Sequence, residues 1–263
     1  MPELPEVESY ARYFARHALN QPITRADVRD ERILGEIRKD AFARKLKGGA
    51  FTSVRRHGKH LFAEVAAKKT WLHLHFGMSG DLAYYRDPKE APRFARIVFD
   101  FAGGAHLAFE DMRLFGVADL VSSPDSFIAD RGLGPDPLDP KFTFSRFAEL
   151  LERRRGAIKS LLMTQEVIAG LGNLWVDETL YLASIHPRRP IDRITKPEMR
   201  AIYTSMRRLL GDVIARHERG GKMPAKSLYE HREVGDRCPR CGGTIERSVV
   251  FGRTTYFCAK HQR

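Results

Sequence analysis

The chain has 263 residues, 43% of them hydrophobic and 30% charged, a composition that excludes an intrinsically disordered protein. It contains no long uncharged apolar run that could cross a bilayer, and we expect no secretory signal in the acidic start MPELPEVESY. The 45 Lys and Arg residues exceed the 33 Asp and Glu residues, which gives a net charge of +12. This excess favours a polyanionic partner, with nucleic acid first and an anionic membrane surface second.

The positive charge is concentrated near the C-terminus. Residues 188–263 contain 18 Lys and Arg residues against 8 Asp and Glu residues, so this segment carries +10 of the +12. Residues 1–187 are therefore nearly neutral. We expect the C-terminal third to provide most of the contact with a polyanion.

The first half of the chain predicts a helix followed by a β-rich domain. Residues 3–19 place apolar side chains at helical spacing, with acidic residues in the first turns, where they suit the helix dipole. Between about 22 and 121, short β-like runs alternate with turn signals, a pattern typical of a sandwich or barrel. The predicted strands are 51–54, 61–65, 71–76, 97–101, 105–109 and 117–121, and the predicted turns are Gly48-Gly49, Gly58, Gly80-Asp81 and Gly103-Gly104.

The second half predicts helices and a small terminal module. Its start is marked by a stretch rich in Pro, Gly and Asp, which indicates a linker over 132–142. The predicted helices are 144–155, 157–168, 173–184 and 197–217. The chain length fits two modest domains, and we expect an α+β multidomain protein with domains at 1–131, 143–222 and 236–263.

The only three cysteines lie within the last 26 residues and predict a metal site rather than disulfides. Cys238 and Cys241 form one knuckle, and Cys258 and His261 form a second knuckle with the same two-residue spacer. Three thiolates and a neutral imidazole can bind one structural Zn²⁺ tetrahedrally. The intervening residues 244–257 alternate like a β-hairpin with Gly252-Arg253 at its tip, and the reduced thiols indicate an intracellular compartment.

Two further features carry chemistry only in combination with others. The run Gly170-Leu-Gly172-Asn173 opens a predicted helix, where exposed N–H groups can bind phosphate, although such turns are often plain helix starts.

Met1 precedes Pro2, a context in which the initiator methionine is normally removed. The exposed α-amine would be far less basic than a lysine, and attack by this secondary amine on a sugar C1′ gives a cationic iminium. Otherwise Pro2 simply starts a helix.

Motifs along nearly the whole chain resemble the formamidopyrimidine-DNA glycosylase/endonuclease VIII family. They are MPELPEVE, GKHLF at 58–62, HFGMSG at 75–80, DMRLFG at 111–116, QEVIAGLGNLWVDETLYLASIHP at 165–187 and the terminal cysteine module. The opening is similar to the formamidopyrimidine branch. The resemblance implies an N-terminal helix with a β-sandwich, then a helix–two-turn–helix domain with a β-hairpin zinc finger.

The resemblance also implies roles for individual residues. Pro2 matches the Schiff-base nucleophile, Glu3 the acid/base that assists sugar opening, and Lys59 the strand lysine at a phosphate near the lesion. Met78, Arg113 and Phe115 match residues that fill the gap left by a flipped nucleotide, for which apolar side chains and a guanidinium are suited. Lys159 and Asn173 match phosphate-contacting positions, and Arg253 matches the finger arginine that grips phosphate and assists the second elimination.

The sequence departs from the family pattern at several positions. His261 stands where a fourth cysteine is usual, and Leu114 replaces a second arginine. The stretch from Gly221 to Cys238 is shorter than in the formamidopyrimidine branch, where it includes a loop over everted 8-oxoguanine. No histidine precedes the predicted strand 97–101, where Arg93 or Arg96 is the available replacement.

We therefore expect a DNA glycosylase with AP lyase activity, which excises damaged bases and nicks the strand by β- and δ-elimination. It would act as a cytoplasmic monomer on double-stranded DNA containing a damaged base or abasic site, with one structural Zn²⁺, no soluble cofactor and no membrane partner. The alternative is a non-catalytic zinc-finger protein that binds damaged or distorted DNA. A transcription factor is a weaker alternative, because no recognition-helix pattern follows the cysteines.

Overall fold

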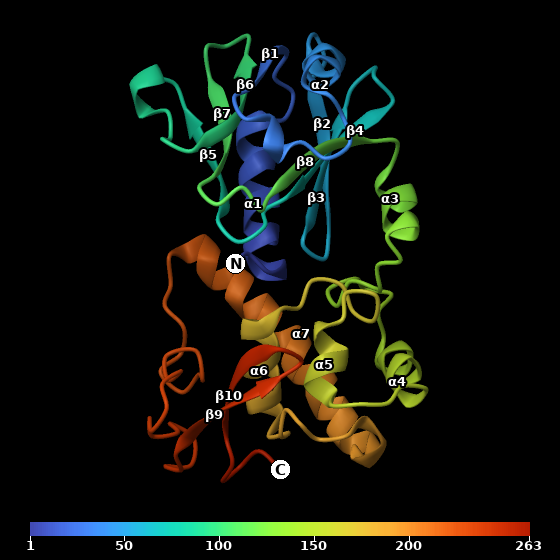
Figure 1. The fold of residues 1–263 in the computed structure, drawn as a ribbon, viewed down its shortest axis with the longest axis vertical. Coiled ribbons are helices and arrows are strands. Elements are labelled where there is room, and N and C mark those ends of the chain that lie inside the picture. The colour runs from blue at the N-terminus through green and yellow to red at the C-terminus, as the bar shows by residue number, and fades with distance from the viewer. The chain divides into compact units, whose positions relative to one another are not determined.

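The computed structural model describes residues 1–263 and divides the chain into two compact units (Figure 1). Unit 1 comprises Met1–Pro2 and Glu6–Gly132, and unit 2 comprises Glu3–Pro5 and Leu133–Arg263. None of the helices combines the length and the apolar character needed to span a bilayer.

Unit 1 contains two four-stranded antiparallel sheets. The first has the order β1 (Ile23–Val28), β6 (Ala95–Phe101), β7 (His106–Asp111) and β5 (Gly80–Tyr85). The second has the order β2 (Phe51–His57), β3 (His60–Val65), β4 (Thr70–His75) and β8 (Val117–Val121). The helices α1 (Leu4–Ala18), α2 (Lys39–Leu46) and α3 (Pro124–Asp130) accompany these sheets.

Aromatic side chains join the helix and both sheets in one core. Phe14 of α1 meets Phe51 of β2 edge-on, with ring centroids 5.0 Å apart. Phe51 in turn meets Phe99 of β6 edge-on at 5.6 Å, an arrangement that favours packing of two ring quadrupoles. The predicted α+β architecture with a β-sandwich is therefore confirmed.

Several elements of unit 1 differ from the sequence-based expectation. The predicted turn at Gly80-Asp81 is wrong, because both residues pair with β7 as the start of β5. The strand β1, the strand β5 and the helices α2 and α3 were not expected. The two helices are short and bury few side chains; α2, for example, buries only Phe42 and Leu46.

Unit 2 is helical and ends in a two-stranded hairpin. Its elements are α4 (Phe144–Glu152), α5 (Ile158–Met163), α6 (Asn173–Ala183), α7 (Lys196–Arg219), β9 (Ile245–Val250) and β10 (Arg253–Cys258). The expected helix 157–168 ends early, at Met163. The residues that follow form a turn, in which the Gln165 side chain bonds to the backbone. Its amide donates to the carbonyls of Met163 and Leu171 and accepts from the Gly170 N–H group.

Candidate active site

The Glu3 carboxylate caps the start of α6. Its two oxygens accept hydrogen bonds from the backbone N–H groups of Gly172 at 2.8 Å, Leu174 at 3.0 Å and Trp175 at 3.3 Å. These donors and the helix dipole stabilise the ionised carboxylate. A Cβ on Gly172 would lie 2.3 Å from the Glu3 carboxyl carbon, so only glycine permits this approach.

This arrangement corrects the expected phosphate site at Gly170–Asn173. A phosphate at a helix start needs free N–H groups. Here the N–H groups of Gly172, Leu174 and Trp175 already donate to Glu3. The glycine-rich turn therefore holds a side chain of the protein itself, the Glu3 carboxylate.

Lys59 lies at the turn between β2 and β3, in unit 1 with Pro2. The turn uses Gly58 at a φ of 55°, a left-handed conformation that favours glycine. Arg56 supports it by donating to the Gly58 carbonyl oxygen at 3.1 Å and to the Glu8 carboxylate at 2.7 Å. Although burial alone would raise the pKa of Glu8, Arg56 and Arg12 hold it below its ordinary value, so this ion pair ties the hairpin to α1.

Met78, Arg113 and Phe115 lie on two adjacent turns of unit 1. Gly77 approaches the Phe115 backbone so closely that a Cβ would lie 2.3 Å from its carbonyl carbon. Met78 is 43% exposed and Phe115 is 53% exposed, and the Arg113 guanidinium lies over the Phe115 ring at 4.9 Å. The structure thus groups two exposed apolar side chains with one cation, the residue types that can fill a gap in a base stack.

The buried Asp111 carboxylate fixes the shape of the second turn. It accepts from the N–H groups of Arg113 at 3.1 Å and Gly116 at 2.6 Å, and from the Ser79 hydroxyl of the neighbouring turn. The Arg96 guanidinium adds a bond to the Asp111 carbonyl oxygen at 2.7 Å. Arg96, rather than the exposed Arg93, therefore supports this surface.

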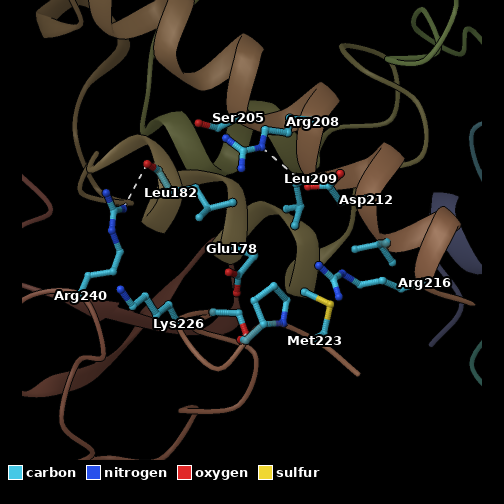
Figure 2. Close-up of a pocket in the computed structure, with 13 residues that line it drawn as sticks. Glu178, Leu182, Ser205, Arg208, Leu209, Asp212, Arg216, Met223, Lys226 and Arg240 are labelled. Atoms are coloured by element: carbon cyan, nitrogen blue, oxygen red, sulfur yellow. Dashed lines mark hydrogen bonds and ion pairs between the residues drawn. The ribbon is translucent and has the colours of Figure 1, made fainter. Parts of the chain in front are cut away.

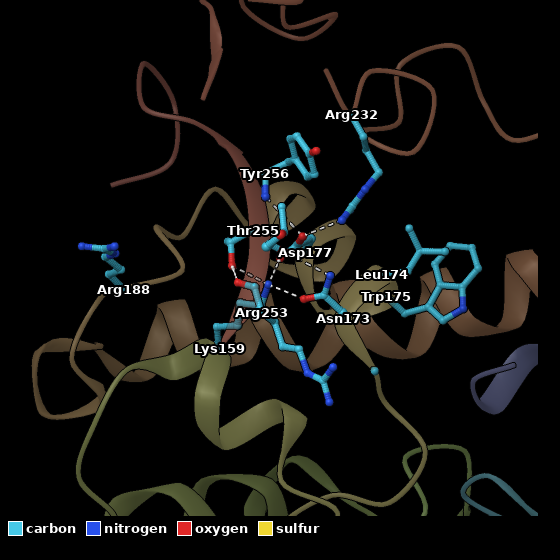
Figure 3. Close-up of polar contacts among 12 residues, drawn as sticks. Lys159, Asn173, Leu174, Trp175, Asp177, Arg188, Arg232, Arg253, Thr255 and Tyr256 are labelled. Atoms are coloured by element: carbon cyan, nitrogen blue, oxygen red, sulfur yellow. Dashed lines mark hydrogen bonds and ion pairs between the residues drawn. The ribbon is translucent and has the colours of Figure 1, made fainter. Parts of the chain in front are cut away.

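Lys159 is fully buried in unit 2 and joins α6 to the hairpin (Figure 3). Its ammonium donates to Asn173 Oδ1, Asp177 Oδ1 and Thr255 Oγ1, each at 2.7 Å. All three N–H groups are used, so a direct phosphate contact by Lys159 would require loss of these bonds. The phosphate contact of Lys159 stays a prediction. In the structure, Lys159 holds the Asn173 side chain in place through the bond to Oδ1.

Asn173 lies beside the tip of the hairpin that carries Arg253. The Asn173 amide donates to the Thr254 carbonyl oxygen at 2.9 Å, which fixes the hairpin tip next to the start of α6. The Arg253 side chain is exposed and extends away from the Lys159–Asp177 pair (Figure 3). An exposed guanidinium beside a carboxamide is suited to holding a phosphate.

The four predicted metal ligands form one cluster. Their ligand atoms all lie within 4.8 Å of one another, with 3.5 Å between Cys241 Sγ and both Cys258 Sγ and His261 Nδ1. Such separations fit a tetrahedral site, in which Zn–S is about 2.3 Å and Zn–N about 2.0 Å. His261 Nε2 lies 3.3 Å from the Tyr181 carbonyl oxygen, which leaves Nδ1 for the metal. These residues hold a structural Zn²⁺.

A cavity of about 370 Å³, which none of these residues lines, lies between α6, α7 and the segment after α7 (Figure 2). Its wall includes the Glu178 carboxylate, whose pKa is raised to about 7 by burial against the opposing effect of backbone hydrogen bonds. The cavity contains neither Glu3 nor Asn173, and we assign it no reaction.

The supporting roles of several residues were not predicted from the sequence. These residues are Ser79, Arg96, Asp111, Trp175, Asp177, Glu178, Arg232 and Thr255. Each acts through partners that are distant in the chain, as in the bond between Lys159 and Thr255, and a single sequence carries no signal for such pairs. Several of them lie inside the quoted motifs, as Asp111 does in DMRLFG, and Arg96 was named as a possible replacement, but the motifs alone do not show which partners these side chains have.

Three family models match successive parts of the chain. The formamidopyrimidine-DNA glycosylase N-terminal domain matches residues 1–118, and the H2TH domain of the same enzyme matches 133–224. The zinc finger found in FPG and IleRS matches residues 235–260.

Curated relatives and solved structures agree with these matches. Formamidopyrimidine-DNA glycosylase of Chloroflexus aurantiacus is 36% identical over 98% of this chain and 96% of its own, and that of Paracoccus denitrificans is 34% identical over 98% of both. The Lactococcus lactis enzyme, non-covalently bound to DNA containing an AP site, superposes with a TM-score of 0.87 at 26% identity over 99% of both chains. MutM in complex with DNA containing carbocyclic 8-oxo-G gives 0.88 at 27% identity over 100% of both chains.

Proposed function

The chain belongs to the formamidopyrimidine-DNA glycosylase family, and we propose that this DNA glycosylase is bifunctional, excising damaged bases and then cleaving the strand through its N-terminal proline. The observation that carries the proposal is Glu3, held by the N–H groups of Gly172, Leu174 and Trp175, directly after Pro2 in the chain. This capping supports the assignment of Glu3 as the proton carrier for its chain neighbour Pro2.

The first stage replaces the base by the enzyme. Once Met1 is removed, the Pro2 nitrogen attacks C1′ and the N-glycosidic bond breaks, so that the base leaves with its electron pair and takes up a proton. The ionised Glu3 carboxylate accepts the proton from the alkylated Pro2 nitrogen and delivers it to O4′. The sugar ring then opens and leaves a cationic iminium between Pro2 and C1′.

The second stage cleaves the strand. The iminium withdraws electrons, so a proton leaves C2′ and the C3′–O bond breaks to release the 3′-phosphate. Loss of a further proton from C4′ releases the 5′-phosphate, and water hydrolyses the iminium to free Pro2. Lys59, Asn173 and Arg253 would hold the phosphates, while Met78, Arg113 and Phe115 would occupy the space vacated by the flipped nucleotide.

The proposal is tested with a labelled duplex that contains one abasic site. The wild-type chain, with Met1 removed, should cleave it to products with an unsaturated aldehyde or a phosphate at the 3′ end. Gly172→Ala should slow cleavage at least tenfold, since the new Cβ displaces Glu3, whereas Gly211→Ala on α7, where a Cβ meets nothing within 4 Å, should not. Tight binding of the duplex without cleavage would instead identify a non-catalytic binder of damaged DNA.

A further inference from the structure

β1 is an edge strand, and part of its outer side has no neighbouring strand. It lies at the end of its sheet, where β6 is its only partner strand. The Arg29 N–H group, just after β1, donates to the Arg96 carbonyl oxygen at 2.8 Å and so faces β6. Backbone groups in an antiparallel pair face the partner at alternate residues, so those of Ala26 and Val28 face the outer side. No group of the chain bonds to them there.

The start of β1 shows that its outer side can pair with an extended backbone. The Ile23 N–H group donates to the Gly49 carbonyl oxygen, and the Gly48 N–H group donates to the Ile23 carbonyl oxygen, both at 2.8 Å. These two bonds occupy the position of a further strand at one end only. The edge is therefore open over Thr24–Val28, a length that suits an added strand of about four or five residues.

The helix α2 lies along this open edge and forms the other wall of a groove (Figure 1). The groove has a volume of about 510 Å³ and is lined by Thr24–Val28, Lys39, Asp40, Ala43, Arg44 and Lys47. Lys39, Ala43 and Lys47 follow one another at intervals of four residues, so they lie on one face of the helix. α2 has eight residues and is about 12 Å long, which about four residues of extended chain can match.

The groove has an excess of positive charge. Its lining residues include four cations and two carboxylates. One carboxylate, that of Asp27, is already paired, because it accepts from Arg25 at 2.9 Å. By contrast, Lys39, Arg44 and Lys47 form no ion pair and no side-chain hydrogen bond. The charge of the groove therefore favours an occupant that carries carboxylates.

We propose that this groove binds an acidic segment of a partner protein, which adds to the edge of β1 as an extended strand. Such a segment can accept from the N–H groups of Ala26 and Val28, donate to their carbonyl oxygens and place carboxylates beside the cations of α2. The DNA backbone fits less well, because its phosphates cannot donate to the two carbonyl oxygens. A second copy of β1 would bring Arg25 next to the same cations. The inference is independent of the proposed glycosylase function, since no residue of the groove has a role in that chemistry.

Binding is tested on the full-length protein by fluorescence anisotropy with the labelled peptide Asp-Val-Glu-Val-Asp-Val at low salt. Alternate amides of an added strand face β1. N-methylation of one alternate set of peptide amides should therefore weaken binding at least tenfold, whereas N-methylation of the other set should weaken it less than threefold. In the protein, saturating peptide should slow the amide hydrogen exchange of Ala26 and Val28 at least tenfold, as measured by nuclear magnetic resonance.

The double variant Arg44→Glu/Lys47→Glu reverses two cations of the groove and should weaken peptide binding at least tenfold. The matched control is Lys68→Glu/Lys69→Glu in the turn between β3 and β4, because both lysines are exposed and the change in net charge is the same. The control should bind the peptide within twofold of wild type. Both variants should cleave an abasic duplex within twofold of wild type at saturating enzyme, and thermal melting checks that both remain folded.

Several results would overturn the inference. They are no binding of the peptide up to about 1 mM, equal binding of both N-methylated peptides and the parent, or unchanged exchange at Ala26 and Val28. A loss of affinity for abasic DNA in Arg44→Glu/Lys47→Glu beyond that of the control would assign the groove to nucleic acid. Self-association of the wild type that this variant abolishes would assign it to a second copy. Absence of abasic-site cleavage by the wild type would contradict the proposed function alone.

Discussion

At the residue scale, buried charges connect the parts of unit 2. Asp177 accepts from Lys159, from Arg232 at 2.9 Å and from the Tyr256 N–H group, so one carboxylate joins α6 to the hairpin and to the preceding segment. Burial lowers the pKa of Lys159 from its ordinary value, against the attraction of Asp177. Such a site is stable only while every partner is present.

The substitution Lys159→Met should destabilise the protein by about 3–5 kcal/mol, because it removes the buried ammonium that Asp177, Asn173 and Thr255 share as a donor. Urea denaturation followed by circular dichroism measures this loss. The exposed cation Arg208, whose side chain is 82% exposed, supplies the control Arg208→Met, expected to cost under 1 kcal/mol. A loss below about 1 kcal/mol for Lys159→Met would contradict the assigned role of this ammonium.

Because of Glu178, the free energy of unfolding should decrease as the pH rises. Burial raises its pKa to about 7, so between pH 5 and pH 7 the folded state holds a proton that the unfolded state has released. The free energy of unfolding therefore decreases over this window, by up to about 3 kcal/mol, and becomes constant above it. Glu178→Gln removes this titration, and urea denaturation of both proteins at several pH values measures the difference. If the free energies of unfolding of the wild type and Glu178→Gln change with pH in the same way, this assignment is contradicted.

At this scale, prediction from sequence succeeded for residues whose partners lie close to them in the chain. Cys238 and Cys241, like Cys258 and His261, are three residues apart, and such spacing by itself specifies a knuckle. Lys159 matched a phosphate-contacting position of the family, and its bonds to Asp177 and Thr255 could not be foreseen because these partners are distant in the chain. The capping of α6 by Glu3 could not be foreseen either, because it joins residues about 170 positions apart.

At the element scale, the long and strongly periodic segments were predicted well. The helices α1, α6 and α7 and the central strands β3, β4 and β6 lie within a few residues of their expected bounds, since each buries a regular set of apolar side chains. β1 and β5 were missed, because their sequences ITRADV and GDLAYY mix polar and apolar residues without clear alternation. Tertiary pairing with β6 and β7 defines them instead.

The hairpin of β9 and β10 should depend on zinc. Apart from Ile245, Val250, Thr255, Phe257 and Cys258 it buries little, so chelation should unfold residues 236–263 and release Thr255 from Lys159. We expect one zinc per chain by elemental analysis and at least a tenfold loss of affinity for abasic DNA after removal, restored by added Zn²⁺. His261→Cys should retain the metal, and His261→Ala should lose it more readily. Full DNA affinity of the metal-free protein would contradict this dependence.

At the scale of the whole molecule, charge and proposed chemistry are separated along the chain. Residues 188–263 carry +10 of the net charge of +12 and belong to unit 2, together with Asn173 and the zinc cluster. Unit 1 contains Pro2, proposed to attack the sugar, Met78 and Phe115, proposed to fill the vacated stack, and one proposed phosphate contact, Lys59, all in the nearly neutral remainder of the chain. We therefore propose that unit 2 supplies most of the phosphate binding, while the proposed nucleophile of unit 1 is an uncharged amine.

The central claim is that Pro2 forms a covalent iminium with the sugar, and reduction by sodium borohydride tests it most directly. With a duplex that contains an abasic site or a damaged base, hydride should convert the iminium to a stable amine, and mass mapping should locate the adduct on the peptide that begins with Pro2. Pro2→Gly, or a chain with an added residue before Pro2, should lose the adduct while still binding the duplex. Absence of an adduct on every such duplex, or an adduct on another residue, would contradict the account.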